Sequence, residues 1–173
     1  MTTQSRSKNA LTTLSLVIAS GFGLGYAPFA PGTFGTLLGV LLFYCSAQLN
    51  SFVKIVLLLV LSFVAVFTAQ VAGKYYRSPD SQHIVIDEVV GYLWAVVATS
   101  YSWQTAVVHF VFFRFFDILK PWPASFFDRQ MKNGWGVVLD DIAAGLYAGL
   151  ASWCVFHFLP VSWEMKDVLM KVH

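Results

Sequence analysis

Carboxylate side chains stand next to long apolar stretches at three places in this sequence. Five of the nine acidic residues abut or interrupt an apolar run: Asp87, Glu88, Asp117, Asp140 and Asp141. A carboxylate beside hydrocarbon is unfavourable unless it is paired, hydrogen-bonded or bound to a metal. Oxygen ligands of this kind suit Mg²⁺, a hard cation that prefers carboxylates and water. The candidate metal ligands are therefore Asp87, Glu88, Asp140 and Asp141.

Two cations flank one of these acids at helical spacing. Arg114, Asp117 and Lys120 share about one face of a helix that Pro121 ends. An arginine holds phosphate oxygens through two hydrogen bonds, and a lysine supplies a mobile positive charge. We therefore take Arg114, Lys120 and Arg129 as candidates to hold a phosphate, although Lys120 and Arg129 could instead attract anionic lipid headgroups. Asp117 would position or deprotonate the attacking water, or attack as a nucleophile itself.

A turn rich in glycine and threonine at residues 30–36 precedes an uncharged apolar run. Free N–H groups at the start of the following helix would stabilise an anion, so Gly32 and Thr33 are candidate phosphate-binding residues. The same turn could serve tight helix packing alone. Two Gly-x-x-x-Gly pairs are expected to pack helices, and a homodimer through such a face is an open alternative: Gly35 with Gly39, and Gly145 with Gly149.

The acidic residues also have purely structural explanations. Asp140 and Asp141 would cap a helix that starts at Ile142, and Asp87 with Glu88 could cap the helix that follows them. The carboxylate between the two cations could form an intrahelical ion pair. The alternative function is a small transporter or channel, because acids within a membrane often mark ion paths. A transporter predicts acids deep in several helices, whereas these are expected at helix ends on one side.

The composition places these residues in a membrane protein. Of 173 residues, 57% are hydrophobic and only 12% are charged, whereas soluble domains have about 45–50% apolar and about 25% charged residues. A net charge of +2 without a basic block argues against a nucleic-acid partner. The length allows one domain. We expect residues 1–173 to form a single integral-membrane domain with polar segments at 1–13 and 161–173.

Apolar stretches that approach the length of a membrane span, about 20 residues, recur along the chain. The predicted segments are residues 34–49, 55–72, 89–116 and 142–159, with a weaker, glycine-containing stretch at 14–26 that suits an interfacial or re-entrant helix. The third segment must enter and return as a short hairpin, because positive residues place the loops at 73–83 and 120–135 on the same, cytoplasmic side. The predicted fold is all-α, a polytopic membrane bundle of about four to six helices.

Four sequence blocks combine these motifs in a fixed order. They are Pro-Gly-Thr-Phe-Gly at 31–35, Ile-Val-Ile-Asp-Glu-Val-Val-Gly at 84–91, the Arg-x-x-Asp-x-x-Lys-Pro block within 113–123, and Gly-Val-Val-Leu-Asp-Asp-Ile-Ala-Ala-Gly at 136–145. In this order the blocks resemble the phosphatidylglycerophosphatase A family. One departure is Asn-Gly-Trp-Gly at 133–136, where relatives often show paired glycines.

The resemblance implies an Mg²⁺-dependent lipid phosphatase of the bacterial inner membrane. Such an enzyme converts phosphatidylglycerophosphate to phosphatidylglycerol and inorganic phosphate. The expected protein is multi-pass, with its active site facing the cytoplasm. The resemblance agrees with the residues, because hydrolysis of a phosphomonoester needs charge neutralisation on the phosphoryl oxygens and an aligned nucleophile.

Overall fold

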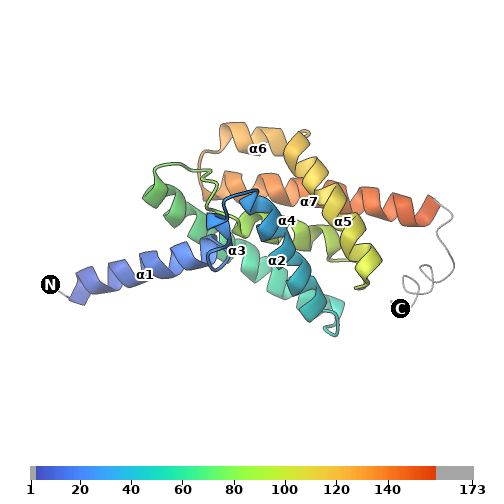
Figure 1. Cartoon of the computed structure of the whole chain (residues 1–173), viewed down its shortest axis with the longest axis horizontal. Coiled ribbons are helices and arrows are strands. Elements are labelled where there is room, and N and C mark those ends of the chain that lie inside the picture. Colours follow the sequence, from blue (N-terminus) through green and yellow to red (C-terminus); the bar gives the residue numbers. More distant parts are fainter. Residues whose placement is uncertain (1–2, 159–173) are drawn as a thin grey trace.

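The computed structural model describes residues 3–158, and in this part of the chain every regular element is helical (Figure 1). The elements are α1 (Thr3–Ala19), the 3₁₀ turn η1 (Leu24–Tyr26), α2 (Pro31–Cys45), α3 (Ser51–Tyr76), α4 (Ile86–Val96), α5 (Trp103–Leu119), α6 (Ala124–Gln130) and α7 (Gly134–Phe158). The all-α prediction is confirmed. The described residues form seven α-helices, one more than the upper end of the predicted range, because α6 was not expected.

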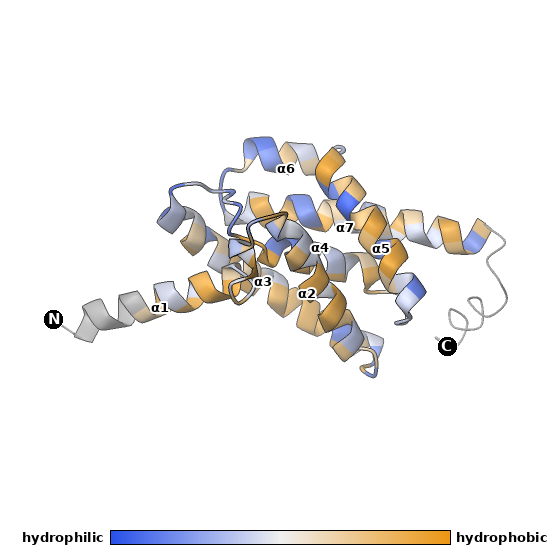
Figure 2. Ribbon diagram, viewed as in Figure 1, coloured by the Kyte–Doolittle hydropathy of each residue, from blue (hydrophilic) through white to orange (hydrophobic). Residues whose placement is uncertain are grey.

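Within residues 3–158, two helices are long and apolar enough to cross a membrane, α3 with 26 residues and α7 with 25. At a rise of 1.5 Å per residue each reaches roughly 38 Å, which exceeds the hydrocarbon thickness of about 30 Å. Large apolar side chains cover their outward faces, with Phe63 of α3 63% exposed and Trp153 of α7 56% exposed. Apolar residues also dominate α2 and α5 (Figure 2). This arrangement is consistent with a membrane helical bundle.

The beginnings of two helices follow from local hydrogen bonds. Before α3, the Asn50 side chain accepts a hydrogen bond from the Val53 N–H at 2.9 Å. Before α5, Ser102 and Thr105 form a capping box in which each side chain accepts the backbone N–H of the other. Such side chains satisfy the free N–H groups of a first helical turn. Asn50 lies before the predicted segment 55–72, whereas Ser102 lies inside the predicted segment 89–116, between the two arms of the hairpin.

The predicted hairpin is present as α4 and α5, joined by residues 97–102. Its arms are unequal, with 11 residues in α4 and 17 in α5. The short arm lies inside the bundle, packed by α2, α3, α5 and α7. Val89, Val90 and Tyr92 of α4 have no exposed surface. An 11-residue helix, too short to span a bilayer alone, is thus shielded by its neighbours.

Both Gly-x-x-x-Gly pairs pack against this central helix. A Cβ atom at Gly35 of α2 would lie 2.7 Å from the Val85 carbonyl oxygen, and one at Gly149 of α7 would lie 2.9 Å from that of Ala95. The second member of each pair approaches α4 as well: Gly39 and Gly145. The expected packing role of these glycines is confirmed. Because α4 covers both stripes, a homodimer would need a different face, and it stays a prediction.

The last helix begins at Gly134, not at Ile142 as predicted. Asn133 starts it, because its side-chain oxygen accepts hydrogen bonds from the N–H groups of Trp135 and Gly136. Asp140 and Asp141 therefore lie inside α7, where they cannot cap it. The capping explanation of this pair is wrong.

The N-terminal helix also begins earlier than expected. Helix α1 starts at Thr3, so it includes most of the predicted polar segment 1–13. The glycine-rich turn predicted after it is present, with Gly21 at φ 56° and Gly23 at φ 97°. Glycine adopts this left-handed conformation without steric cost. The polar tail predicted at 161–173 lies outside the described residues.

Candidate active site

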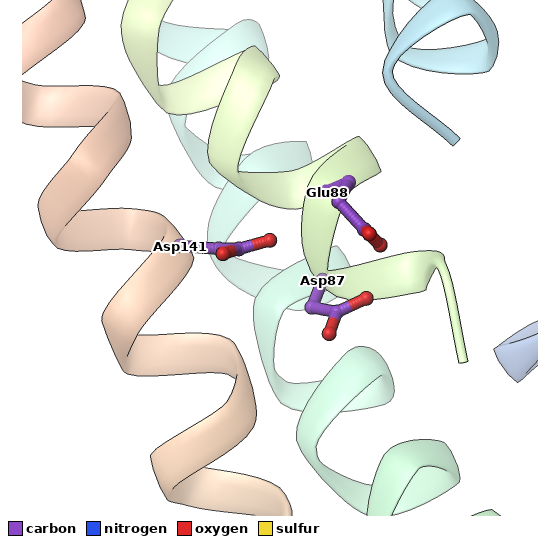
Figure 3. A group of neighbouring side chains, drawn as sticks. All are labelled: Asp87, Glu88 and Asp141. Atoms are coloured by element: carbon purple, nitrogen blue, oxygen red, sulfur yellow. The ribbon is translucent and has the colours of Figure 1, made fainter. Parts of the chain in front are cut away.

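Three carboxylates from two helices converge at one end of the bundle. Asp87 and Glu88 lie in the first turn of α4, and Asp141 points toward them from α7 (Figure 3). One oxygen of each carboxylate lies within 4.8 Å of the other two. A cation with oxygen ligands at about 2.0–2.6 Å holds those ligands at most about 5 Å apart. The spacing of this acidic trio therefore fits a single divalent cation.

The surroundings of the trio also favour a cation. Asp87 Oδ1 and Glu88 Oε2 are buried and accept no hydrogen bond within the described residues. Burial raises the pKa of Asp87 well above its ordinary value, and the neighbouring charge of Glu88 raises it further. Burial likewise raises the pKa of Glu88. Buried carboxylates are stable when they are neutralised or coordinate a metal, so the donor set fits Mg²⁺ or a similar hard ion.

Glycines on both helices allow the trio to form. A Cβ atom at Gly91 of α4 would lie 2.7 Å from the Asp141 carbonyl oxygen. One at Gly145 of α7 would lie 2.1 Å from the Gly91 carbonyl oxygen. The two backbones thus approach as closely as they can, which small residues permit in membrane bundles. This contact places Asp141 within reach of the carboxylates on α4.

Asp140 points to a different partner from its neighbour Asp141. The Lys120 ammonium donates hydrogen bonds to Asp140 Oδ2 at 2.5 Å and to Asp128 Oδ1 at 2.8 Å. The second oxygen of Asp140 accepts the Asp141 backbone N–H at 3.0 Å. Of the four predicted metal ligands, the structure brings three together, and it places Asp140 in an ion pair.

The electrostatics of Lys120 reflect these two acids. Burial lowers the pKa of Lys120, but the charge of Asp140 and the hydrogen bonds to Asp128 and Asp140 raise it above its ordinary value. The pKa of Asp128 falls below its ordinary value because it accepts the Lys120 hydrogen bond. Both groups therefore stay charged near neutral pH.

Asp128 is a site residue that the sequence did not reveal. It lies in α6, a seven-residue helix in a segment that was predicted to be a loop. The only sequence signal was a single acid among the basic residues of that segment.

The start of α2 meets both the trio and a cation. A Cβ atom at Gly32 would lie 2.2 Å from Glu88 Oε1 and 3.1 Å from Arg114 Nη1. Arg114 Nη1 also lies 2.7 Å from Asp117 Oδ2, one turn further along α5, but in a geometry that leaves it without a formal hydrogen bond. The predicted intrahelical pair is therefore present. Arg114 nevertheless keeps donor capacity beside Glu88 and the N-terminus of α2.

Two of the candidate phosphate-binding residues stand apart from this arrangement. The Thr33 N–H bonds to the Ala30 carbonyl oxygen at 2.9 Å, so it is not a free donor. Arg129 of α6 forms no ion pair within the described residues, although its charge contributes to the lowered pKa of Asp128. Gly32, Arg114 and Lys120 are thus the candidates that the structure places nearest to the acids.

An apolar cavity of about 500 Å³ lies elsewhere in the bundle, between the end of α2, the first half of α3 and the end of α4. Its lining includes Leu42, Leu57 and Val96, with Lys54 as its charged member. Such a lining has few groups that could hold a phosphate, and the acids of α4 lie at the opposite end of that helix. The candidate site is therefore the polar end of the bundle.

The model of one protein family, described as Phosphatidylglycerophosphatase A, matches residues 17–156. This range contains every residue of the site. The chain belongs to the phosphatidylglycerophosphatase A family. The resemblance seen in the four sequence blocks is confirmed, and the protein is a phosphatase.

Several bacterial relatives share most of the chain. A phosphatidylglycerophosphatase A of Haemophilus influenzae is 34% identical over 158 residues, covering 87% of this chain and 97% of the relative. One of Escherichia coli is 31% identical over 147 residues, covering 84% and 85%. A Bacteroides thetaiotaomicron protein named as a candidate phosphatidylinositol-3-phosphatase is 32% identical, covering 82% and 96%. No solved structure matches the chain.

Proposed function

We propose that this protein is a Mg²⁺-dependent phosphatase that hydrolyses phosphatidylglycerophosphate to phosphatidylglycerol and inorganic phosphate. The family supports this substrate. The observation that carries the metal dependence is the acidic trio, in which Asp87, Glu88 and Asp141 offer oxygens within 4.8 Å of one another. Asp140 serves as the counter-ion of Lys120 in this proposal.

The side chains around the trio supply the rest of the chemistry. When bound, Mg²⁺ would neutralise charge on the phosphoryl oxygens. Arg114 and Lys120 would bind those oxygens and stabilise the charge that develops in the transition state. Gly32 lets the start of α2 lie directly against Glu88 and Arg114, because a Cβ atom there would come 2.2 Å from Glu88 Oε1 and 3.1 Å from Arg114 Nη1.

Asp117 is the proposed catalytic carboxylate. It either orients and deprotonates a water molecule or attacks phosphorus directly and forms an aspartyl phosphate. Hydrolysis in ¹⁸O-labelled water, combined with trapping of a phosphoryl-enzyme, tests the two routes. In a single turnover with excess enzyme, direct attack by water puts the label into phosphate and leaves the Asp117 carboxylate unlabelled. Hydrolysis of an aspartyl phosphate at phosphorus also labels phosphate, so a trapped phosphoryl-enzyme at Asp117 identifies the second route.

We also propose that the acidic end of the bundle faces the cytoplasm, in a multi-pass protein of the inner membrane. The connecting segments at this end, together with the end of α3 and the short helix α6, hold a group of cations: Lys74, Arg77, Lys120, Arg129 and Lys132. The α2–α3 connection at the opposite end is followed by Lys54. Cytoplasmic loops carry an excess of lysine and arginine. In this orientation the trio lies beside the headgroups of the cytoplasmic leaflet.

The test is phosphate release from phosphatidylglycerophosphate in detergent micelles, with and without EDTA. We expect release that stops with EDTA and returns with added Mg²⁺. The Asp141→Asn variant should lose turnover with its thermal unfolding unchanged. Release that is insensitive to EDTA would contradict the metal assignment. An absence of release in micelles, combined with ion flux in sealed vesicles, would favour a transporter instead.

A further inference from the structure

Lys120 is held between three elements by its backbone and its side chain. It ends α5 in a left-handed conformation at φ 46°, with its N–H donating to the Phe116 carbonyl oxygen. Its ammonium reaches Asp140 on α7 and Asp128 on α6. The carboxylate of Asp140 is 5% exposed and that of Asp128 is 27% exposed. Asp140 therefore contacts the ammonium from the interior of the bundle, and Asp128 contacts it from the surface.

The hydrogen bonds of the ammonium define its direction. A lysine ammonium has three N–H donors and no acceptor. Two of these donors are used by Asp128 and Asp140 within the described residues. With one acid, the flexible four-carbon chain could rotate around a single contact. With two acids on different helices, the ammonium is fixed and its remaining donor has a defined direction.

We infer that Asp128 is a positioning residue, which fixes the Lys120 ammonium so that its third donor is available to a phosphoryl oxygen. This inference rests on the proposed function. The Asp128 carboxylate cannot itself attract a phosphate, because both groups are negatively charged. Its effect must come from the orientation of Lys120. Helix α6 is then the element that carries this carboxylate to the site.

Orientation and charge make opposite kinetic predictions for Asp128→Asn. If only charge mattered, removal of a negative group would strengthen phosphate binding and lower KM. If Asp128 orients a donor that acts in the transition state, kcat falls at least about tenfold while KM changes little. Asp128→Glu keeps the carboxylate one methylene further out, and we expect it to recover part of kcat.

A double-mutant cycle separates positioning from simple structural support. If Asp128 acts through Lys120, then Lys120→Ala combined with Asp128→Asn should be no slower than Lys120→Ala alone. Lys132→Ala is the matched control. Lys132 donates to the Asp128 backbone carbonyl oxygen, so its loss perturbs the same part of α6 and spares the carboxylate. We expect this control to keep kcat within about twofold of the parent.

Measurements on the full chain in detergent, with thermal unfolding recorded for each variant, decide the inference. An unchanged kcat in Asp128→Asn would overturn it, as would additive losses in the double mutant. A loss in Lys132→Ala as large as that in Asp128→Asn would also overturn it, because α6 would then act only as a support. An inactive parent chain would overturn the proposed function itself. If Asp128→Asn does not fold, recovery of kcat in Asp128→Glu supports the inference, and its absence in a folded Asp128→Glu contradicts it.

Discussion

Gly145 of α7 lies directly against the carbonyl oxygen of Gly91 in α4, and a Cβ atom at Gly145 would come 2.1 Å from that oxygen. The neighbour is backbone, so it cannot move aside as a flexible side chain would. One turn earlier on α7 stands Asp141, and one turn earlier on α4 stand the other two members of the trio. The separation of the two helices at this contact therefore sets the distance between Asp141 and the two carboxylates on α4.

The first prediction is that Gly145→Ala loses both stability and activity. The added methyl group must push α7 away from α4, which we expect to lower the free energy of unfolding by about 1–3 kcal/mol. The displaced carboxylates should reduce kcat/KM at least about tenfold, since small misplacements of catalytic groups have large effects. Denaturation and phosphate release measure the two losses. Gly149→Ala, with its nearest contact at 2.9 Å from Ala95 and further from the acids, should affect activity less.

The second prediction concerns the start of α2. In Gly32→Ala the new Cβ atom would overlap Glu88 Oε1, 2.2 Å away, and crowd Arg114 Nη1 at 3.1 Å. Glu88 can swing aside, so we expect normal folding but an apparent Mg²⁺ affinity and a kcat/KM that are each lower by at least about tenfold. Gly39→Ala is the comparison within the same helix, because its Cβ would meet Tyr92 at 3.0 Å, away from the trio. Equal activity losses in both variants would contradict a site at Gly32.

The third prediction is that the trio alone determines metal affinity. Asp141→Asn should weaken Mg²⁺ binding at least about tenfold, because a neutral amide replaces a charged ligand. Titration calorimetry measures this without reference to turnover. Asp80→Asn makes the same chemical change at an exposed carboxylate that belongs to no part of the trio. The site assignment would be wrong if Asp80→Asn weakened binding as much as Asp141→Asn.

The fourth prediction is a pH dependence of stability that comes from Asp128 and Lys120. The pKa of Asp128 is lowered in the folded protein, so its stabilising effect is present above its ordinary pKa of about 3.9 and is lost as pH falls through the folded value. The pKa of Lys120 is raised, so its effect is present below its ordinary pKa of about 10.4 and is lost only as pH rises through the folded value.

The difference in Tm between the parent chain and Asp128→Asn should therefore stay constant from about pH 5 to pH 9 and shrink in acid below about pH 4. Thermal unfolding in detergent across this range is the measurement. A difference that instead vanished near neutral pH would mean that the ion pair is not formed in the folded protein.

Much of the site was predictable because an uncompensated charged side chain is unfavourable within or beside a membrane segment. Acids that abut apolar runs must be compensated, and this, with the expected position of these acids at one membrane face, predicted that Asp87, Glu88, Asp140 and Asp141 meet. The assignment of Asp140 was not predictable. Adjacent residues on a helix point about 100° apart, so one of the pair on α7 faces α4 and the other faces Lys120. The sequence does not state the rotation of α7 about its axis.

The missed elements have equally specific reasons. The start of α7 looked like a loop because glycines flank Trp135, yet the Asn133 side chain supplies the cap that begins the helix there. Helix α6 has only seven residues, too few for a hydrophobic period to show. Because helix α6 was not predicted, its residue Asp128 was not predicted to be near Lys120 either.

The glycine-lined contact between α4 and α7 also restricts how this protein can vary over evolutionary time. Positions 91 and 145 touch backbone on the facing helix, so one extra methyl group there should displace the carboxylates of the proposed site. The lipid-facing sides of α3 and α7 need only remain apolar, and many side chains satisfy that demand. Neutral substitutions should therefore accumulate on the outside of the bundle. At the contact between α4 and α7, positions 91 and 145 should remain glycine.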